Sequence, residues 1–349
     1  MPNAFSFMAI IVCVLFFFLM NILYLPYLEK KIIEFRKKTK KKIWDGWKVI
    51  LLYGLNGLKS LFRIDLVPPK MNSVLFSIAF FFLLGIILGT LALIPYGPAT
   101  NFYGMTKGKL PLWIMNLETG LFSIFTLLTL SALSLLFVGL SFSSSAGLTA
   151  GFRSALRILS LGIPMAFSLV SITVLAGSLN LSAIVVAQSK VWYLFTLVGP
   201  VACGIYFFVS AIAVNQVFSS FSSSSMLEHQ PPEHRDRINP FNFSVLFRNA
   251  YLIVISLLIV LVFLGGWLPM QIPERSVLGA GINRGLAELP AVFWLLLKFY
   301  LVIIFSLGMR IIISRFDEHR LINISWKVLV PGSLFLLIFT VGMKQKGWL

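Results

Sequence analysis

The side chains of this chain that could do chemistry at a hydrophobic site are cations set in or beside apolar runs. They are Arg153, Arg157, Arg248, Lys298 and Arg310. The acids fall in polar segments or at the edges of these runs, as Glu29 does. A proton relay across a membrane needs side chains that change protonation, usually Asp, Glu or His. The pattern therefore favours a structural role for these charged side chains over a proton relay. We expect Lys298 to be buried against a partner group, and Arg153 and Arg310 to snorkel to the interface.

One polar segment contains residue types that bind metal ions. It holds Glu228, His229, Glu233 and His234. Pro231 and Pro232 between the two pairs prevent a shared helical face, so a solvated loop is favoured over a metal site. Cys13 and Cys203 are far apart and lie within apolar runs, so we expect them to be packing residues. The sequence has no glycine-rich phosphate loop, nucleophile elbow or dinucleotide motif, and it predicts no catalytic residue and no metal site.

The composition indicates the class of protein. Hydrophobic residues make up 58% of the 349 residues and charged residues 12%, roughly half the charged fraction of a soluble domain. This excludes a soluble globular protein. About eight runs approach or reach the roughly 20 apolar residues that cross a bilayer. They lie near Phe5–Leu25, Val74–Ile94, Leu121–Leu140, Ile158–Ala176, Trp192–Val214, Val245–Leu268, Ala291–Ile313 and Val328–Met343.

The predicted fold is therefore all-α and polytopic, a single integral membrane domain over residues 1–349. The first run lacks a cleavage pattern and is interpreted as an anchor helix. Residues 29–70 form a basic loop, in which Ile43–Phe62 has an apolar and a charged side and is predicted to be an amphipathic interfacial helix. Residues 219–243 form a low-complexity loop that begins with a serine run.

The distribution of charge predicts the orientation. The chain has 29 Lys and Arg against 12 Asp and Glu, a net charge of +17, and the cations gather after the first, third, fifth and seventh runs. Because the inner surface of a membrane protein is normally rich in Lys and Arg, these connections are predicted to face the cytoplasm or the matrix, with both termini outward. We call that side the inner end. Nucleic-acid binding is disfavoured, because aromatic residues do not interleave with the basic ones.

A longer motif resembles a known family. Residues 151–181 read GFRSALRILSLGIPMAFSLVSITVLAGSLNL, which resembles the fourth-helix region of the H subunit of NADH:quinone oxidoreductase, respiratory complex I, known in mitochondria as subunit one. Further matches follow in the family's order. They include Glu29-Lys30-Lys31, Gly57-Leu58-Lys59, Asp65 with Pro68, Phe263-Leu264-Gly265-Gly266-Trp267, Leu297-Lys298, Arg310 with Arg315-Phe316-Asp317, and Trp326-Lys327 with Pro331.

The resemblance implies a set of quinone-region or interface residues. They are Glu29, Lys59, Asp65, Arg153, Ser154, Pro164, Lys298, Arg310, Arg315, Asp317, Trp326 and Lys327. It also implies that the chain binds no cofactor of its own, with quinone at a subunit interface. The implied partners are the other membrane-arm and peripheral-arm subunits and the lipid bilayer. The implied location is the bacterial plasma membrane or, alternatively, the mitochondrial inner membrane.

The chain departs from the family where acids are expected. A Tyr-Glu pair that precedes the Ile-Pro-Met of the fourth helix is replaced by Leu161 and Gly162. Other expected glutamates correspond to Ile212, to Ser222 and Ser224 within the serine run, and to Arg248, a reversal of charge. An arginine stays protonated at ordinary pH and cannot relay protons. The route from a quinone cavity to proton-pumping subunits therefore lacks an obvious titratable carrier.

Three functions are compatible with these observations. The first is a membrane-arm core subunit that bridges the quinone-site region and the proton-pumping arm. The second is a scaffold paralogue of that subunit, which keeps the fold and the assembly contacts without catalysis. The third is an independent carrier of an anion or a lipid, which the cations near the apolar runs suggest, although the sequence shows no internal repeat.

Overall fold

The computed structural model describes residues 4–36, 72–98, 112–142, 145–219, 241–269, 290–313 and 318–346. The long helices in these ranges are α1 (Ala4–Arg36), α3 (Ser73–Leu93), α4 (Gly120–Ser141), α5 (Ser145–Ala176), α7 (Gly199–Ser219), α9 (Phe241–Phe263), α11 (Ala291–Ile313) and α13 (Val330–Gln345). Short helical segments join them: α6 (Leu181–Ala187), the 3₁₀ turn η3 (Tyr193–Phe195), α12 (Glu318–Ile324) and the π-helix η5 (Ser325–Leu329). The all-α prediction is confirmed.

Six helices of the described residues are long and apolar enough to cross a membrane. They are Ser73–Leu93, Gly120–Ser141, Gly147–Ala176, Leu246–Phe263, Ala291–Arg310 and Arg320–Gln345. Ile10–Pro26 and Gly199–Asn215, which overlap the other two predicted spans, are shorter apolar helices. The chain is thus a polytopic membrane protein. The predicted interfacial helix Ile43–Phe62 and nearly all of the 219–243 loop lie outside the described residues.

Several boundaries differ from the predicted ones. The predicted fifth span begins at Gly199 instead of Trp192, because η3 comes first and Pro200 suits a helix start. The predicted sixth ends at Phe263 instead of Leu268, because Gly265 and Gly266 adopt positive φ angles of 71° and 51°. The fourth begins earlier, at Ser145, and the last helical run continues from Glu318 through the π-helix.

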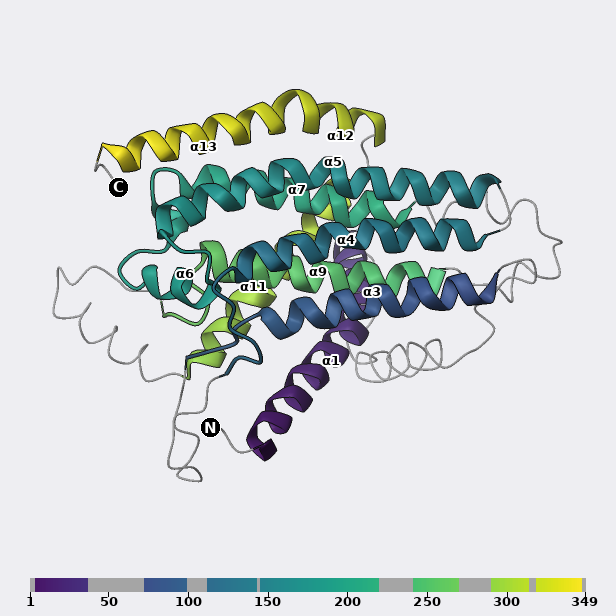
Figure 1. Cartoon of the computed structure of the whole chain (residues 1–349), viewed down its shortest axis with the longest axis horizontal. Helices are drawn as coiled ribbons and strands as arrows, with labels where there is room; N and C mark the ends of the chain where they lie inside the picture. The colour runs from purple at the N-terminus through teal and green to yellow at the C-terminus, as the bar shows by residue number, and fades with distance from the viewer. Residues whose placement is uncertain are drawn as a thin grey trace.

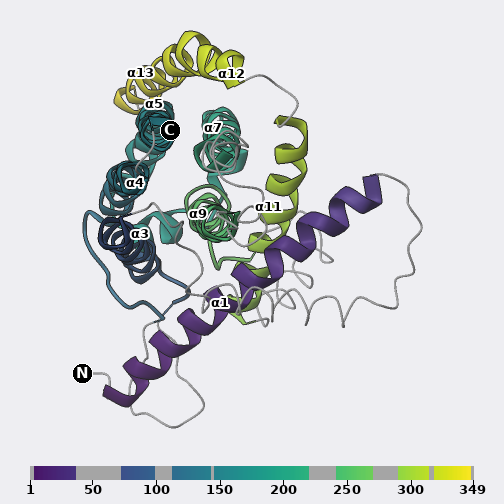
Figure 2. The same cartoon turned by 90° about the vertical axis from the view of Figure 1, so that its right-hand side faces the viewer.

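The helices form two neighbouring rows (Figures 1 and 2). α3, α4 and α5 lie side by side, and α7 and α9 lie next to them, with α11 against α9 and α7. α12 and α13 run along the outside of α5, and α1 crosses the bundle obliquely against α9 and α11. α9 is the central helix: 89% of the residues in Leu246–Phe263 are buried, against 22% in the most apolar 18-residue stretch of Arg320–Gln345. The more exposed helices offer apolar side chains to lipid or to other proteins.

Hydroxyl groups form hydrogen bonds between neighbouring helices. Apolar packing alone would leave the relative rotation of these helices poorly fixed. The Ser134 Oγ donates to the carbonyl oxygen of Ala79 over 2.9 Å, joining α4 to α3. The Ser168 Oγ donates to the carbonyl oxygen of Ala202 over 2.7 Å, joining α5 to α7. Such bonds between membrane helices stabilise by about 1 kcal/mol each. The first bond fixes the rotation of α4 against α3 within one row, and the second fixes that row against α7.

α4 and α5 touch through backbone atoms at a pair of glycines. A Cβ added to Gly139 would lie 2.6 Å from the Cα of Gly151, and a Cβ added to Gly151 would lie 2.7 Å from the Cα of Gly139. Small residues allow membrane helices to approach this closely. The early start of α5 at Ser145 follows from this contact, because residues of low hydropathy are still packed there against α4.

Replacing Gly139 by alanine should therefore separate α4 from α5. We expect Gly139→Ala to lower the free energy of unfolding by about 1–3 kcal/mol through overpacking, measured as a lower thermal unfolding midpoint of the purified protein. Gly85→Ala on α3 is the matched control, because nothing lies within 4 Å of its Cβ position and alanine favours the helix by up to about 1 kcal/mol. Equal midpoints for the two variants would contradict the close contact.

Candidate functional site

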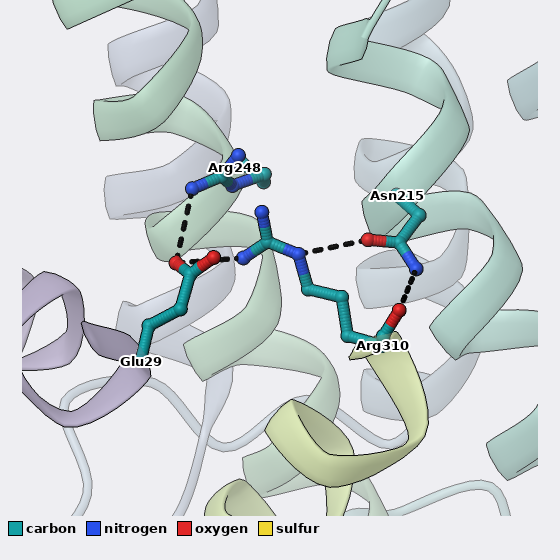
Figure 3. Close-up of polar contacts among 4 residues, drawn as sticks. All are labelled: Glu29, Asn215, Arg248 and Arg310. Carbon is teal, nitrogen blue, oxygen red and sulfur yellow. Dashed lines mark hydrogen bonds and ion pairs between the residues drawn. The ribbon is translucent and has the colours of Figure 1, made fainter. Parts of the chain in front are cut away.

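Four polar side chains meet at the inner end of the bundle (Figure 3). Glu29 comes from the C-terminal part of α1, Asn215 from that of α7 and Arg310 from that of α11, while Arg248 lies near the start of α9. α9 runs opposite to the other three helices, so its N-terminal part reaches the same end. We call these four residues the charged cluster. It joins helices that are far apart in the sequence.

Glu29 is shared by two arginines. The Arg248 Nη2 donates to the Glu29 Oε2 over 3.2 Å, and the Arg310 Nη1 donates to the same oxygen over 3.0 Å. Between 13% and 22% of each of these three side chains is exposed. Charge-assisted hydrogen bonds are stronger than neutral ones. One carboxylate faces two guanidinium groups, so the three side chains carry a net charge of +1.

Asn215 binds Arg310 from the other side. The Arg310 Nε donates to the Asn215 Oδ1 over 2.8 Å, and the Asn215 Nδ2 donates to the backbone oxygen of Arg310 over 3.2 Å. The pair of bonds fixes the plane of the guanidinium group. Arg310 is therefore held in one orientation between α1 and α7.

The charged cluster corrects two predictions. Arg310 does not snorkel to the interface as predicted, because Glu29 and Asn215 lie within hydrogen-bonding distance. The predicted loop over residues 29–70 begins too early, because α1 continues through Pro26 to Arg36 and carries Glu29 on the helix, just past its apolar part Ile10–Pro26. The importance of Arg248 as a partner of Glu29 was missed, since 219 positions separate the two residues and no local pattern pairs them.

Lys298 is buried at the opposite end of the bundle. Its Nζ donates to the backbone oxygens of Leu264, Gly266 and Leu268 over 2.6, 3.0 and 2.7 Å. It also lies 4.0 Å from the centre of the Trp192 ring, which is within the range of a cation–π contact. Lys298 was predicted to be buried against a partner group, and the structure agrees. The partner is a set of carbonyls in the turn that follows α9, so Lys298 holds that turn in place.

Other predicted residues take no part in either arrangement. Arg153 is exposed on α5, as expected for a snorkelling cation, and the adjacent Ser154 is buried with its Oγ donating to the oxygen of Ala150 over 2.9 Å. Pro164 is buried within α5, and Trp326 and Lys327 are exposed on the π-helix. Lys59, Asp65, Ser222, Ser224, Arg315 and Asp317 lie outside the described residues, as does the segment from Glu228 to His234.

Two positions where the resemblance predicts glutamates are apolar contacts. Gly162 is buried against α4, and a Cβ there would lie 3.6 Å from the Thr129 Cγ2 and 3.7 Å from the Phe125 Cζ. A methyl group at this position would therefore be in ordinary van der Waals contact with α4. Ile212 on α7 is fully buried in the core. Within the described ranges, no three His, Cys, Asp or Glu residues gather to bind a metal ion.

Comparison with known proteins decides the family. The family model described as NADH dehydrogenase matches residues 8–224 and 239–341. The chain belongs to this NADH dehydrogenase family. Glu29, Asn215, Arg248 and Arg310 all lie in the matched ranges, so the charged cluster is built within the part of the chain that the NADH dehydrogenase family shares.

Individual relatives in the NADH dehydrogenase family agree along nearly the whole chain. The H subunit of the NADH-quinone oxidoreductase of Paramagnetospirillum magneticum is 26% identical over 348 residues, covering 97% of this chain and 92% of that protein. The H subunit numbered 2 of the same enzyme of Rhizobium meliloti is 26% identical and covers 90% of each. NADH-ubiquinone oxidoreductase chain 1 of Cyanidium caldarium is 26% identical over 92% of this chain and 87% of its own length. The resemblance that the sequence motifs indicated is confirmed.

Neutralising Glu29 should loosen the inner end of the NADH dehydrogenase fold. Glu29→Gln leaves two partly buried arginines without a counter-charge, and we expect a loss of about 1.5–3 kcal/mol in the free energy of unfolding. Thermal unfolding of the purified protein measures this loss. Glu118→Gln is the matched control, because Glu118 is exposed at the outer end and should cost under about 1 kcal/mol. A Glu29→Gln variant as stable as the control would contradict the pairing.

Removing the ammonium group of Lys298 should destabilise the outer end. Lys298→Met leaves three backbone carbonyls without their donor, and we expect a loss of at least about 3 kcal/mol. Lys344→Met provides the comparison, because Lys344 also donates to a backbone oxygen, that of Val174, but is exposed, so that water can replace it. The same unfolding measurement should show a loss below about 1 kcal/mol there. A larger effect at Lys344 than at Lys298 would refute the role of Lys298 in holding the turn after α9.

Proposed function

We propose that this chain is a membrane-arm core subunit of a complex-I-like NADH:quinone oxidoreductase assembly. In this role it bridges the region of the quinone site and the proton-pumping arm, and most of the proton-path carboxylates have been lost. Membership of the NADH dehydrogenase family supports the assembly role, as do relatives named as H subunits or as chain 1 of such enzymes that match along most of their length.

The distribution of carboxylates carries this part of the proposal. Among the side chains that the structure describes, the carboxylates are Glu29 and Glu118. Glu118 precedes α4 at the outer end, whereas Glu29 lies at the inner end and is bound by two arginines. Protonating Glu29 would remove the charge that both guanidinium groups contact. A hydrocarbon core about 30 Å thick therefore separates two acids, of which one is engaged in ion pairs.

The positions where the resemblance expects acids support the same conclusion. Gly162 packs against Phe125 and Thr129, and Ile212 is enclosed in the core. Arg248 carries the opposite charge and binds Glu29. Each of the three positions has a packing or pairing role that suits a structural subunit. None of the three side chains can take up and release a proton at ordinary pH.

The chain would then contribute structure and contacts to the assembly. The basic inner surface would bind peripheral-arm subunits through complementary charge. The sequence has 29 Lys and Arg but only 12 Asp and Glu. Exposed apolar residues of α11 and α13 would face lipid or neighbouring membrane-arm subunits. Quinone would lie at a subunit interface, and the chain itself would bind no flavin, iron–sulfur cluster or metal.

A scaffold paralogue without redox or pumping function is the second candidate. The same observation favours it, because an interior without free carboxylates is compatible with packing but poor at passing protons. The two candidates differ only in what the complete assembly does. They agree that the chain is bound to other subunits.

Purification of the tagged chain from its native membrane in a mild detergent tests the proposal. We expect iron–sulfur and antiporter-like subunits to co-purify, as identified by mass spectrometry. Isolation of the chain alone would overturn both assembly functions and favour an independent carrier of an anion or a lipid. A variant with Glu29→Gln and Arg310→Gln, which disrupts the charged cluster, should reduce the yield of the assembly relative to Glu118→Gln.

Activity of the purified assembly separates the two candidates. Quinone reduction with NADH and proton uptake into liposomes are measured together. We expect inhibitor-sensitive quinone reduction with fewer protons moved per electron than in a related assembly whose corresponding membrane subunit carries the acids. The absence of both activities would indicate the scaffold. Full pumping would contradict the loss of the relay at Gly162, Ile212 and Arg248.

A further inference from the structure

The outer end of α9 is closed by side chains from other parts of the chain. The last carbonyl oxygens of a helix have no donor within that helix, and inside a membrane they need one from elsewhere in the protein. Gln188 is such a donor, since its Nε2 donates to the oxygens of Leu261 and Val262 over 3.0 and 3.1 Å. Its Oε1 accepts from the backbone nitrogen of Tyr193 over 3.3 Å. Gln188 is 1% exposed, so these bonds are kept from water.

The turn after α9 also takes its hydrogen bonds from the protein. The Val260 oxygen accepts from the backbone nitrogens of Leu264 and Gly266. The oxygens of Leu264, Gly266 and Leu268 accept from the Nζ of the buried Lys298. These carbonyls therefore need no water, although they lie at the end of a helix where water normally binds.

Residues 181–198, which contain α6 and η3, lie over this end of α9. We call them the outer cover. A Cβ added to Gly265 would lie 3.0 Å from the Trp192 Cδ1, and a Cβ added to Gly266 would lie 3.1 Å from the Val185 Cγ2. The outer cover thus touches the turn at both glycines and leaves no space for a water molecule there.

The last part of α9 before this end is apolar and enclosed. Residues 257–263 are all hydrophobic, and none of them is more than 2% exposed. At a rise of 1.5 Å per residue they span roughly 10 Å along the helix. Hydrophobic constrictions of this kind exclude water and ions from membrane pores.

Polar groups without a partner lie on the inner side of this apolar stretch. Among the side chains that the structure describes, α9 has three buried polar atoms without a hydrogen-bond partner, namely the Arg248 Nε, the Asn249 Nδ2 and the Ser256 Oγ. Buried polar groups are normally satisfied by the protein or by ordered water. All three precede residue 257, so the need for water along α9 ends at Ser256.

We propose that residues 257–263 of α9 and the outer cover together form the barrier that keeps water and protons from crossing the bundle along α9. Gln188 and Lys298 take the place of water at the carbonyls of the outer end. Water that enters from the inner end stops at the apolar stretch after Ser256. This barrier is a property beyond the proposed role in the assembly, and its test needs neither NADH nor quinone.

Passive proton leak through the reconstituted protein tests the barrier. The chain, together with the partners that co-purify, is placed in liposomes that contain a pH-sensitive dye, and a potassium diffusion potential drives protons inward. Gln188→Ala removes the donor to two carbonyls and leaves space for water, so we expect proton entry several-fold faster than with the unchanged protein. Hydrogen exchange of the backbone amides of residues 257–268 should also become faster in this variant, whereas that of α4 should not change.

A control and a second variant assign the effect to the outer end. Ser168→Ala is the matched control, because it also removes a buried side-chain donor to a backbone oxygen, that of Ala202, but leaves the end of α9 intact. Its leak should equal that of the unchanged protein. Trp192→Ala uncovers Gly265 and the Lys298 ammonium group without removing a hydrogen bond to α9. It should also raise the leak, and it keeps the test decisive if Gln188→Ala does not fold.

Two results would overturn the barrier. One is a proton leak that stays unchanged in both variants, whether or not hydrogen exchange over residues 257–268 becomes faster, because the outer cover would then stabilise α9 without excluding protons. The other is an equal rise of the leak in Ser168→Ala, which would indicate a general loosening of the bundle. Failure of other subunits to co-purify would contradict the proposed function but leaves this test in place.

Discussion

The Glu29 carboxylate is the contact that makes the packing of α1, α9 and α11 specific. Lipid tails are as apolar as leucine side chains, so apolar packing alone gives membrane helices little reason to choose one orientation. α1 also meets α11 through the rings of Phe17 and Phe299, whose centres lie 5.7 Å apart. That contact tolerates rotation and sliding. The bonds from Arg248 and Arg310 to one carboxylate oxygen do not, and Asn215 extends the constraint to α7.

Cations at the outer end work differently, by binding backbone carbonyls at the end of a helix or in the turn that follows it. The last carbonyls of a helix lack intrahelical donors and carry a partial negative charge. Lys298 donates to carbonyls that follow α9, and Lys344 donates to the Val174 oxygen near the end of α5. A lysine in such a place satisfies backbone groups that lipid cannot. The two ends of the bundle thus use positive charge for two purposes, ion pairing with an acid at the inner end and binding of backbone carbonyls at the outer end.

The class of fold could be predicted because hydropathy contrast is strong along this chain. The predicted runs Leu121–Leu140 and Ala291–Ile313 coincide with α4 and α11 to within one residue at each end. The start of α5 could not be predicted in the same way, since the contact between Gly139 and Gly151 depends on a neighbouring helix and not on hydropathy. Contacts between residues far apart in the sequence could not be predicted either. Glu29 and Arg310 are 281 positions apart, and the carbonyl partners of Lys298 carry no side-chain signal.

The length of α5 has a consequence for where the chain meets the water on its inner side. A helix of 32 residues is about 48 Å long, whereas the hydrocarbon layer is about 30 Å thick. The excess length requires a tilted helix, first turns that extend past the acyl chains, or both. Because Gly151 packs against Gly139 near the end of α4, only the turns of α5 before this contact can extend beyond α4. A tilt of α5 would carry α4 with it, since the two backbones touch there.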